Sequence, residues 1–363
     1  MSRRFRVLAL VTDAFGAPGG IAQYNRDLLT TLAEEAGFEI VILARRGSAG
    51  ETTPARGITQ LRPRPGRIGY IAAALRAAAT RRFDLVFCGH LYAAPLARAA
   101  ARLRGSRLLV QLHGIDAWTA PRRQARKAFE RADLVLSVSR FTRAAALGWS
   151  RLEPHRIAVI PNTVRDVFVP GDRRSSRLAL GLDDRRVLLS VGRLDSREAY
   201  KGQDRIIDVL PGLIAGGRRV AYVVAGEGDD RIRLESLARE RGVGDAVHFL
   251  GEIEEAGLPP LYRAADLFVM PSTGEGFGIV FLEAMASGTP ALGLAAGGAP
   301  DAMADGALGT LVQAERLGPA IAALLDGAET DPAALSGAVA ERFGRAAFRR
   351  AVGRLADRLA ETS

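Results

Sequence analysis

The chain has 363 residues, of which 48% are hydrophobic and 25% are charged, and its net charge is +10. This length allows two domains of ordinary size with a substantial core, and no apolar run is long enough to cross a bilayer. The single cysteine, Cys88, excludes an internal disulfide and fits a reducing cytoplasm; it lies in an apolar run, where a buried thiol is the ordinary expectation.

Positive charge is concentrated in the first half of the chain. Up to Pro170 there are 27 Lys and Arg against 12 Asp and Glu, a balance of +15, whereas the remainder has a balance of −5. The first half should therefore attract anionic surfaces. Nearly all of this charge is arginine, which favours bidentate contact with phosphate.

Three arginines precede the first apolar run, Val7–Val11, so the start of the chain resembles a signal peptide. The run stops at Thr12 and Asp13, too early for the hydrophobic region of such a peptide, so we predict a first β-strand. Gly19 and Gly20 end the loop that follows.

These two glycines directly precede a helix predicted over residues 21–35. Glycines at a helix N-terminus let a diphosphate approach the backbone closely. An ordinary flexible loop is the alternative, because the sequence has no G-x-G-x-x-G motif and no evident acidic ribose partner after the second strand.

Short apolar runs alternate with helical stretches along the chain, which predicts parallel strands covered on both faces. The predicted strands are Val7–Val11, Glu39–Leu43, Asp84–Cys88, Leu108–Leu112, Leu134–Val138 and Ile157–Ile160, then Val187–Val191, Val220–Ala225, Val247–Leu250, Leu267–Met270, Ala291–Leu294 and Thr310–Val312. Two sets of six predict an α/β protein with two doubly wound sheets in tandem. The junction is expected between Asn162 and Arg177, where prolines and charges interrupt the pattern.

Two arginine-rich segments lie in the basic half. The first, Arg56–Arg82, is expected to be a loop up to Gly66 and a helix from Tyr70, and the second, Pro121–Arg131, is expected to be helical. Solvated helix faces are the commoner explanation of such segments. Two of them together favour docking on an anionic membrane surface or binding of an anionic acceptor.

His113 and Asp116 follow the predicted strand Leu108–Leu112. Open α/β sheets keep their sites at the carboxyl ends of strands, so this position favours a functional histidine. A core histidine bonded to backbone is the alternative.

Arg193 and Lys201 follow the predicted strand Val187–Val191, and Lys201 directly precedes a helix predicted over Gln203–Leu210. Two cations near a strand end and a helix start can neutralise a pyrophosphate and stabilise it as a leaving group. A single arginine here would ordinarily be a salt-bridge partner. Farther along, Gly226-Glu-Gly228 leaves backbone room for a flat base.

The most informative stretch is Pro271–Gly298, a strand end, a glycine-rich turn and a helix that begins near Gly278. This arrangement presents backbone N–H groups to a phosphate. Glu275 and Glu283 lie within it, and carboxylates suit the hydroxyl groups of a sugar and a ribose better than a phosphate. A loop carboxylate and a solvated helix carboxylate are the alternatives.

Taken together, these residues resemble the retaining glycosyltransferases of family four. The resemblance covers essentially the whole chain, and its most specific part is the glutamate–seven residues–glutamate motif from Glu275 to Glu283. It implies the GT-B fold, in which two Rossmann-like domains face each other across a cleft. The implied domains are an acceptor domain over 1–168, a donor domain over 169–340, and a C-terminal helix, 341–363, that returns to the first domain.

The resemblance also implies roles for individual residues. Glu275 would hold the donor sugar and Glu283 the ribose, Arg193 and Lys201 would bind the diphosphate, and His113 would lie at the reaction centre. The backbone contacts to the donor would come from Gly19, Gly20, Gly226, Gly276, Phe277, Gly278 and Ile279. No side chain is a secure nucleophile in this family, so front-face attack is the expectation.

Two features depart from the family pattern, a longer segment between Arg193 and Lys201 and Thr163 where a glycine often follows Pro-Asn. No metal or other cofactor is expected. Asp229 and Asp230 could suggest a metal site, but acids at the start of a basic helix are favourable by themselves.

The function implied is transfer of a hexosyl unit from a UDP- or GDP-sugar, with retention, to a lipid-linked or polysaccharide acceptor in cell-surface glycan synthesis. We expect a cytoplasmic protein, with peripheral docking on the inner face of the membrane left open. A nucleotide-sugar epimerase or hydrolase on the same fold is the alternative. A polyanion-binding protein is less favoured, because the basic segments lack interleaved aromatics and no nucleic-acid motif is present.

Overall fold

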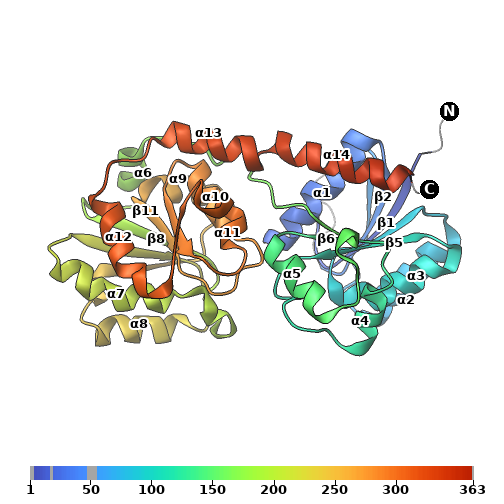
Figure 1. Cartoon of the computed structure of the whole chain (residues 1–363), viewed down its shortest axis with the longest axis horizontal. Helices are drawn as coiled ribbons and strands as arrows, with labels where there is room; N and C mark the ends of the chain where they lie inside the picture. The colour runs from blue at the N-terminus through green and yellow to red at the C-terminus, as the bar shows by residue number, and fades with distance from the viewer. Residues whose placement is uncertain (1–3, 17–18, 47–54, 362–363) are drawn as a thin grey trace. The chain divides into compact units, whose positions relative to one another are not determined.

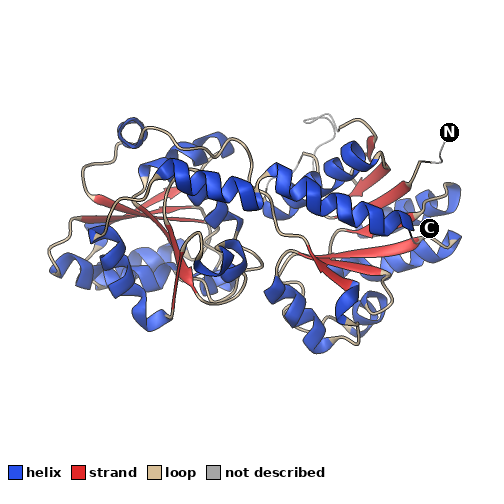
Figure 2. Cartoon of the chain, turned by 45° about the horizontal axis from the view of Figure 1, so that its top comes forward, coloured by secondary structure: helices blue, strands red, loops and turns tan. Residues whose placement is uncertain are grey.

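The computed structural model describes residues 4–16, 19–46 and 55–361, which form two compact units (Figure 1). One unit comprises Met1–Thr163 together with Ala346–Ser363, and the other comprises Val164–Arg345. Each unit is built on one parallel sheet, and Figure 2 shows helices on both faces of these sheets. The predicted α/β class with two doubly wound sheets is therefore confirmed.

The first unit has seven parallel strands in the order β3-β2-β1-β4-β5-β6-β7. Their bounds are β1 Arg6–Val11, β2 Glu39–Ala44, β3 Ile58–Leu61, β4 Leu85–Cys88, β5 Arg107–Leu112, β6 Leu134–Ser137 and β7 Ile157–Val159. Strands β4 and β6 are buried along their whole length. Cover on both faces explains why the sequence shows continuous apolar runs here rather than alternation.

Strand β3 corrects the sequence-based prediction, which placed this segment in a loop and gave the first half six strands. It pairs in parallel with β2 alone, at the edge of the sheet. Its residues are partly or fully exposed, including the polar Thr59 and Gln60. An edge strand buries too little surface to need a continuous apolar run, so this one gave no signal.

The helices of the first unit surround this sheet. They are α1 Gly20–Ala36, α2 Arg67–Thr80, α3 Ala94–Arg104, α4 Arg123–Phe129 and α5 Arg140–Trp149, with short 3₁₀ turns η1 Leu91–Ala93 and η2 Pro154–Arg156. The first predicted basic segment thus becomes helical earlier than expected, because the chain enters α2 directly after Gly66.

The C-terminal helix α14, Arg345–Glu361, packs against the first unit, as predicted. The rings of Phe348 and the buried Tyr24 pack in a T-shaped arrangement, with 6.2 Å between their centroids. The Arg107 side chain donates a hydrogen bond of 2.6 Å to the carbonyl of Leu359. A mostly polar helix is thus fixed by one buried stripe and by side-chain bonds to its backbone.

The second unit has six parallel strands in the order β10-β9-β8-β11-β12-β13. Their bounds are β8 Arg186–Val191, β9 Val220–Ala225, β10 Val247–Gly251, β11 Leu267–Met270, β12 Ala291–Leu294 and β13 Thr310–Val312. The helices are α6 Arg173–Ala179, α7 Gln203–Ala215, α8 Arg231–Glu240, α9 Leu258–Ala264, α10 Ile279–Ala286, α11 Ala299–Ala302, α12 Leu317–Asp326 and α13 Pro332–Phe343, with 3₁₀ turns η3 Ser196–Lys201, η4 Gly244–Ala246, η5 Glu255–Gly257, η6 Ala304–Gly306 and η7 Ala314–Arg316. The bounds of all six strands agree with those predicted from the sequence to within one residue.

Each sheet has one place where the strand order reverses direction. In the first sheet it lies between β1 and β4, and in the second it lies between β8 and β11. Open α/β sheets bind ligands outside the carboxyl ends of the strands at such a point. The strand order thus directs attention to the loops after these four strands. Within residues 4–16, 19–46 and 55–361, no helix combines the length and the apolar character that a membrane span requires.

Candidate functional site

The candidate site in the second unit lies where β8 and β11 end. Gly192 and Arg193 follow β8, and the loop that starts at Pro271 follows β11. The two strands are direct neighbours in the sheet, so both loops leave the same edge. Arg193 and Glu275, two of the sequence-predicted residues of the donor domain, therefore lie in loops at the point where strand order predicts a ligand site.

Glycines allow the loop after β9 to lie on the loop after β8. A Cβ atom on Gly226, which has φ 143°, would lie 1.9 Å from the carbonyl oxygen of Gly192. A Cβ atom on Gly228, with φ 156°, would lie 2.1 Å from the carbonyl oxygen of Leu194. No larger residue fits at these two positions, because both the space and the backbone angle exclude a side chain.

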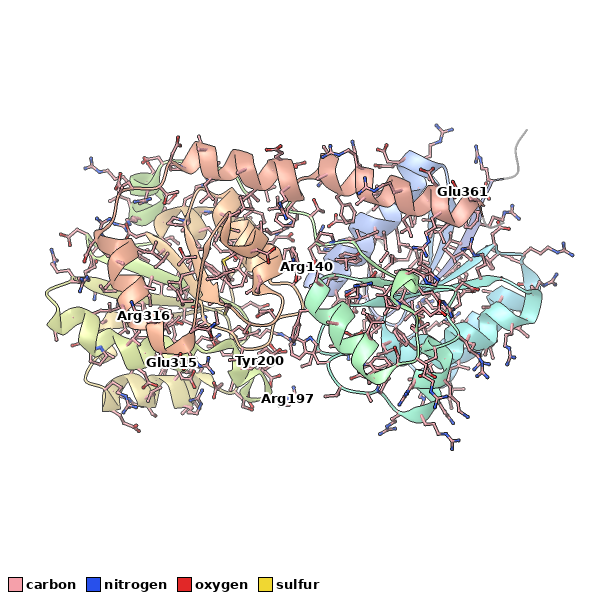
Figure 3. The ribbon with its side chains drawn as sticks, viewed as in Figure 1. Arg140, Arg197, Tyr200, Glu315, Arg316 and Glu361 are labelled. Atoms are coloured by element: carbon pink, nitrogen blue, oxygen red, sulfur yellow. The ribbon has the colours of Figure 1, made fainter. Side chains whose placement is uncertain are left out.

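The backbone around Glu275 is held from two sides. Its carbonyl accepts a hydrogen bond of 2.8 Å from Gly298 N, and Thr273 N donates one of 2.9 Å to the carbonyl of Tyr200. A Cβ atom on Gly297 would lie 2.6 Å from Glu275 N. The loop that carries Glu275 is thus fixed between the loop after β12 and the segment after β8, on which Figure 3 labels Tyr200.

The Glu275 carboxyl has an unusual charge environment. Burial raises its pKa to about 7, and nearby Glu198 adds to the increase. The positive charge of Lys201 and a hydrogen bond with Ser272 act in the opposite direction. The structure therefore brings Glu275 and Lys201 within electrostatic range of each other, and their shared role in donor binding stays a prediction.

Both predicted cations converge on a single carboxylate, that of Glu198. Lys201 Nζ lies 2.7 Å from Glu198 Oε2, and the guanidinium of Arg193 pairs with the other carboxylate oxygen. The Lys201 and Glu198 side chains are each 13% exposed, whereas that of Arg193 is 73% exposed. Sequence reasoning missed Glu198, although its place three residues before Lys201 in a helical turn was the available signal.

Glu283 lies in the interior of the second unit. Its side chain is 9% exposed, its Oε2 accepts a hydrogen bond of 2.8 Å from the hydroxyl of Tyr262, and its Oε1 lies 3.6 Å from Nη2 of Arg165. Burial raises the pKa of Glu283, while Tyr262 and Arg165 oppose that increase. Neither partner was identified from the sequence, because both are remote along the chain. A role of Glu283 in ribose binding stays a prediction.

The helix α10 begins directly after the glycine-rich turn. Gly278 has φ 93°, and a Cβ atom there would lie 2.7 Å from the ring of Phe281. The Phe277 side chain is buried and packs against the ring of Phe343 at 5.7 Å. Any contact of Phe277 with a ligand would therefore come from its backbone, as we expect for Gly276, Gly278 and Ile279.

In the first unit, His113 follows β5 and is held by its neighbours. Its Nε2 lies 2.9 Å from the carbonyl oxygen of Gly89, and Asp116 Oδ1 accepts hydrogen bonds from the backbone N–H groups of His113 and Gly114. Burial lowers the pKa of His113 to about 4, which nearby Asp116 partly offsets. Because a carbonyl can only accept, the neutral ring carries its proton on Nε2 and leaves Nδ1 as an acceptor.

Gly19 is the last residue before α1 and Gly20 is the first residue of that helix, and both are exposed. Gly19 has φ 99°, which favours glycine, and nothing lies within 4 Å of a Cβ atom placed on either residue. Among the described residues, packing therefore leaves space at the Cβ position of both glycines. Contact with a diphosphate stays a prediction.

The two acids at the start of α8 are engaged with protein groups. Asp229 accepts hydrogen bonds of 2.8 Å from the backbone and hydroxyl of Ser196. Asp230 pairs with Arg233, with 2.6 Å between Oδ1 and Nε. Asp229 thus connects the start of α8 to η3, whereas Asp230 pairs with a side chain of α8 itself.

Comparisons with known proteins point in one direction. A family model described as glycosyl transferases group 1 matches residues 172–350, and one described as glycosyltransferase family 4 matches residues 18–167. D-inositol 3-phosphate glycosyltransferase of Mycobacterium tuberculosis is 42% identical over 171 residues, which cover 46% of this chain and 35% of that protein. The match thus spans about a third of the length of the curated relatives.

Solved structures share the fold of the whole chain. HepE of Anabaena in complex with UDP and glucose has a TM-score of 0.79 at 22% identity, covering 99% of this chain and 100% of that one. Sucrose-phosphate synthase of Thermosynechococcus elongatus has a TM-score of 0.80 at 23% identity, with the same coverage. With the two family models, these similarities show that the chain belongs to the family 4 glycosyltransferases of the GT-B fold.

Proposed function

We propose that this protein transfers a hexosyl unit from a nucleoside diphosphate sugar to a carbohydrate or lipid-linked acceptor, with retention and without a metal ion. The observation that carries the proposal is the convergence of Arg193, Lys201 and Glu275 at the reversal point of the second sheet. Two cations there suit a diphosphate, and a carboxylate beside them suits the hydroxyl groups of the sugar.

The two cations would act on the leaving group. When the bond between the sugar and the diphosphate breaks, negative charge grows on the phosphate oxygens. Arg193 and Lys201 would stabilise that charge in place before the reaction starts, which lowers the barrier without reorganisation of solvent. Two fixed positive side chains would perform the task that a divalent cation performs in other phosphate sites.

Glu275 would hold the sugar through its hydroxyl groups. Its backbone is fixed by neighbouring loops, so the carboxylate is placed before the donor arrives. An acceptor hydroxyl would attack the same face of the sugar that the diphosphate leaves, and a leaving phosphate oxygen would take its proton. His113, neutral and with Nδ1 as its acceptor atom, would orient a sugar hydroxyl through a hydrogen bond.

The nucleotide is proposed to be UDP or GDP. HepE of Anabaena has been solved with UDP and with UDP-glucose, which makes a uridine donor a reasonable first probe. The loop Gly226–Gly228 packs on the backbone that follows β8, beside the site, and its main-chain groups would contact the base.

An anionic acceptor or membrane surface would meet the first unit. Among the described residues, Arg126 is the only arginine of α2, α3 and α4 in an ion pair, with Glu130. Burial and the positive charges of Arg131 and Arg102 lower the pKa of Arg98, so cations crowd on this surface. Ile68, on the neighbouring helix α2, is 83% exposed. Cationic residues and an exposed apolar residue on neighbouring helices suit peripheral docking, in line with a role in cell-surface glycan synthesis.

Donor binding can be tested first and sugar transfer second. Thermal stabilisation by UDP, GDP and their hexose conjugates, measured without metal and with EDTA, should identify the donor base. Transfer to a panel of glycan and lipid-linked acceptors should then give a product with the donor's anomeric configuration, and Glu275→Ala should abolish transfer with an unchanged melting profile. Near-normal turnover of that variant, or sugar isomerisation without any acceptor, would contradict the proposal.

A further inference from the structure

Glu198 occupies the position between the two proposed diphosphate ligands. One carboxylate oxygen pairs with Arg193 and the other lies 2.7 Å from Lys201 Nζ. Glu198 Oε2 is buried from solvent. The two cations are therefore already engaged, by a side chain to which neither the family resemblance nor the matched proteins assign a role.

The charge balance of this trio is incomplete. Two cations and one carboxylate leave a net charge of +1, whereas a nucleoside diphosphate brings about two to three negative charges at neutral pH. A diphosphate on Arg193 and Lys201 would lie in direct contact with the Glu198 carboxylate if that group stayed in place. Like charges at contact distance in a poorly hydrated site repel strongly.

The backbone on either side of Glu198 is anchored. Ser196 N donates to Asp229 Oδ1 at 2.8 Å, and the carbonyl of Tyr200 accepts from Thr273 N at 2.9 Å. Glu198 itself interrupts the 3₁₀ turns of η3, with φ −108° and ψ 21°. Release of the cations therefore requires rotation of one side chain, and the loop that carries it can remain in place.

We infer that Glu198 is an internal substitute for the diphosphate, which holds Arg193 and Lys201 together in the empty site and gives them up when a nucleoside diphosphate binds. The inference rests on the proposed function and adds the residue that sets donor affinity. Glu198 keeps two like charges close together without a ligand. It lowers the affinity for every diphosphate by the free energy of the ion pairs that must be broken.

The experiment is a calorimetric titration of UDP, GDP and inorganic pyrophosphate into the full chain and into Glu198→Gln. The variant should bind the diphosphates roughly tenfold more tightly, equivalent to about 1.4 kcal/mol. Uridine and guanosine, which lack phosphate, should bind both proteins equally. Glu235→Gln is the matched control, because Glu235 pairs with Arg231 at 2.8 Å on α8 and should leave all affinities unchanged.

A second pair of variants connects the effect to the cations. In a Lys201→Met background, Glu198→Gln should give a clearly smaller gain in diphosphate affinity, because one of the two cations that Glu198 releases is absent. If Glu198→Gln fails to fold, Glu198→Asp serves instead; its shorter side chain cannot bridge both cations, so it should also bind more tightly than the native chain.

Unchanged or weaker diphosphate binding by a folded Glu198 variant would overturn the inference, and would make Glu198 a residue that positions Lys201. That result leaves the proposed function intact. Absence of diphosphate binding in both the native chain and the variant would overturn the proposed function, and this inference with it.

Discussion

The hydroxyl of Tyr262 on α9 donates a hydrogen bond of 2.8 Å to the carboxylate of Glu283 on α10. On the other side of that carboxylate, Arg165 lies 3.6 Å away. Because a charge-assisted hydrogen bond is about twice as strong as a neutral one, Tyr262 offsets part of the cost of burying Glu283, and the nearby positive charge of Arg165 adds to that effect. The second acid of the Glu275–Glu283 motif is thus part of the interior of the second unit.

Removal of the Tyr262 hydroxyl should therefore be costly. Tyr262→Phe should lower the free energy of unfolding by about 1.5–3 kcal/mol, because it leaves a buried carboxylate with one fewer donor. Tyr222→Phe is the matched control, since the Tyr222 hydroxyl is equally buried but bonds to the neutral Ser190 hydroxyl at 2.9 Å; it should cost about 1 kcal/mol. Urea unfolding followed by far-ultraviolet circular dichroism compares the two variants, and equal costs would show that the bond from Tyr262 to Glu283 is no stronger than a bond between neutral groups.

The pKa of Glu275, raised to about 7 mainly by burial, predicts the pH dependence of transfer. The ionised carboxylate accepts hydrogen bonds from sugar hydroxyls, so kcat/KM should rise with pH through about 7 and then level off. Glu275→Gln should lower kcat/KM by roughly 10- to 100-fold. It should also remove the rise of kcat/KM with pH, the acid limb of the profile. A limb that persists unchanged in Glu275→Gln belongs to another group and would refute the assignment.

His113 should make the first unit sensitive to acid. Its pKa is lowered to about 4 in the folded chain, mainly by burial, whereas the unfolded chain takes up a proton near 6.5. The stability that depends on a neutral His113 is therefore complete above pH 6.5 and is lost as the pH falls toward 4, by about 3 kcal/mol in total.

Tryptophan fluorescence can follow this loss, because Trp118 and Trp149, the only tryptophans in the sequence, both lie in the first unit. In urea unfolding, the free energy of unfolding of the native chain should be lower at pH 5 than at pH 7.5. His113→Gln should lack this decrease. His155→Gln is the control, because the His155 side chain is 68% exposed and should leave the drop unchanged. A drop of equal size in both variants would contradict a buried neutral His113.

Gly226 should not accept even a methyl group. Gly226→Ala would place Cβ 1.9 Å from a carbonyl oxygen at φ 143°, so we expect a loss of about 2 kcal/mol or more together with weaker UDP binding. Gly212→Ala on α7, where nothing lies within 4 Å of a Cβ atom, should instead stabilise the chain by up to about 1 kcal/mol. Thermal melting with and without UDP measures both effects. If Gly226→Ala left the stability and UDP binding unchanged, the loop would be free to move, contrary to this prediction.

The sequence was most informative where a residue's role depends on its immediate neighbours. Strands such as β9 and β11 are buried on both faces, so their apolar runs predicted their bounds. Arg193 and Glu275 were identified because each follows such a strand. The strand order then places both residues beyond the carboxyl ends of two neighbouring strands.

Long-range partners could not be predicted in this way. Arg165 and Tyr262 reach Glu283 only after folding, and their spacing along the chain carries no periodic signal. Strand β3 was missed because an edge strand leaves much of its surface exposed. Glu198 was missed because a carboxylate near two cations looks like an ordinary surface ion pair until its burial is known.

The central claim is that a donor diphosphate is bound by Arg193 and Lys201 while Glu275 holds the sugar. A crystal structure of the chain with a nucleoside diphosphate hexose tests this claim most directly. We predict phosphate oxygens within about 3.2 Å of both cations and the Glu275 carboxylate within hydrogen-bond distance of a sugar hydroxyl. A donor bound away from the ends of β8 and β11, or bound there with Arg193 and Glu275 facing away from it, would contradict the account.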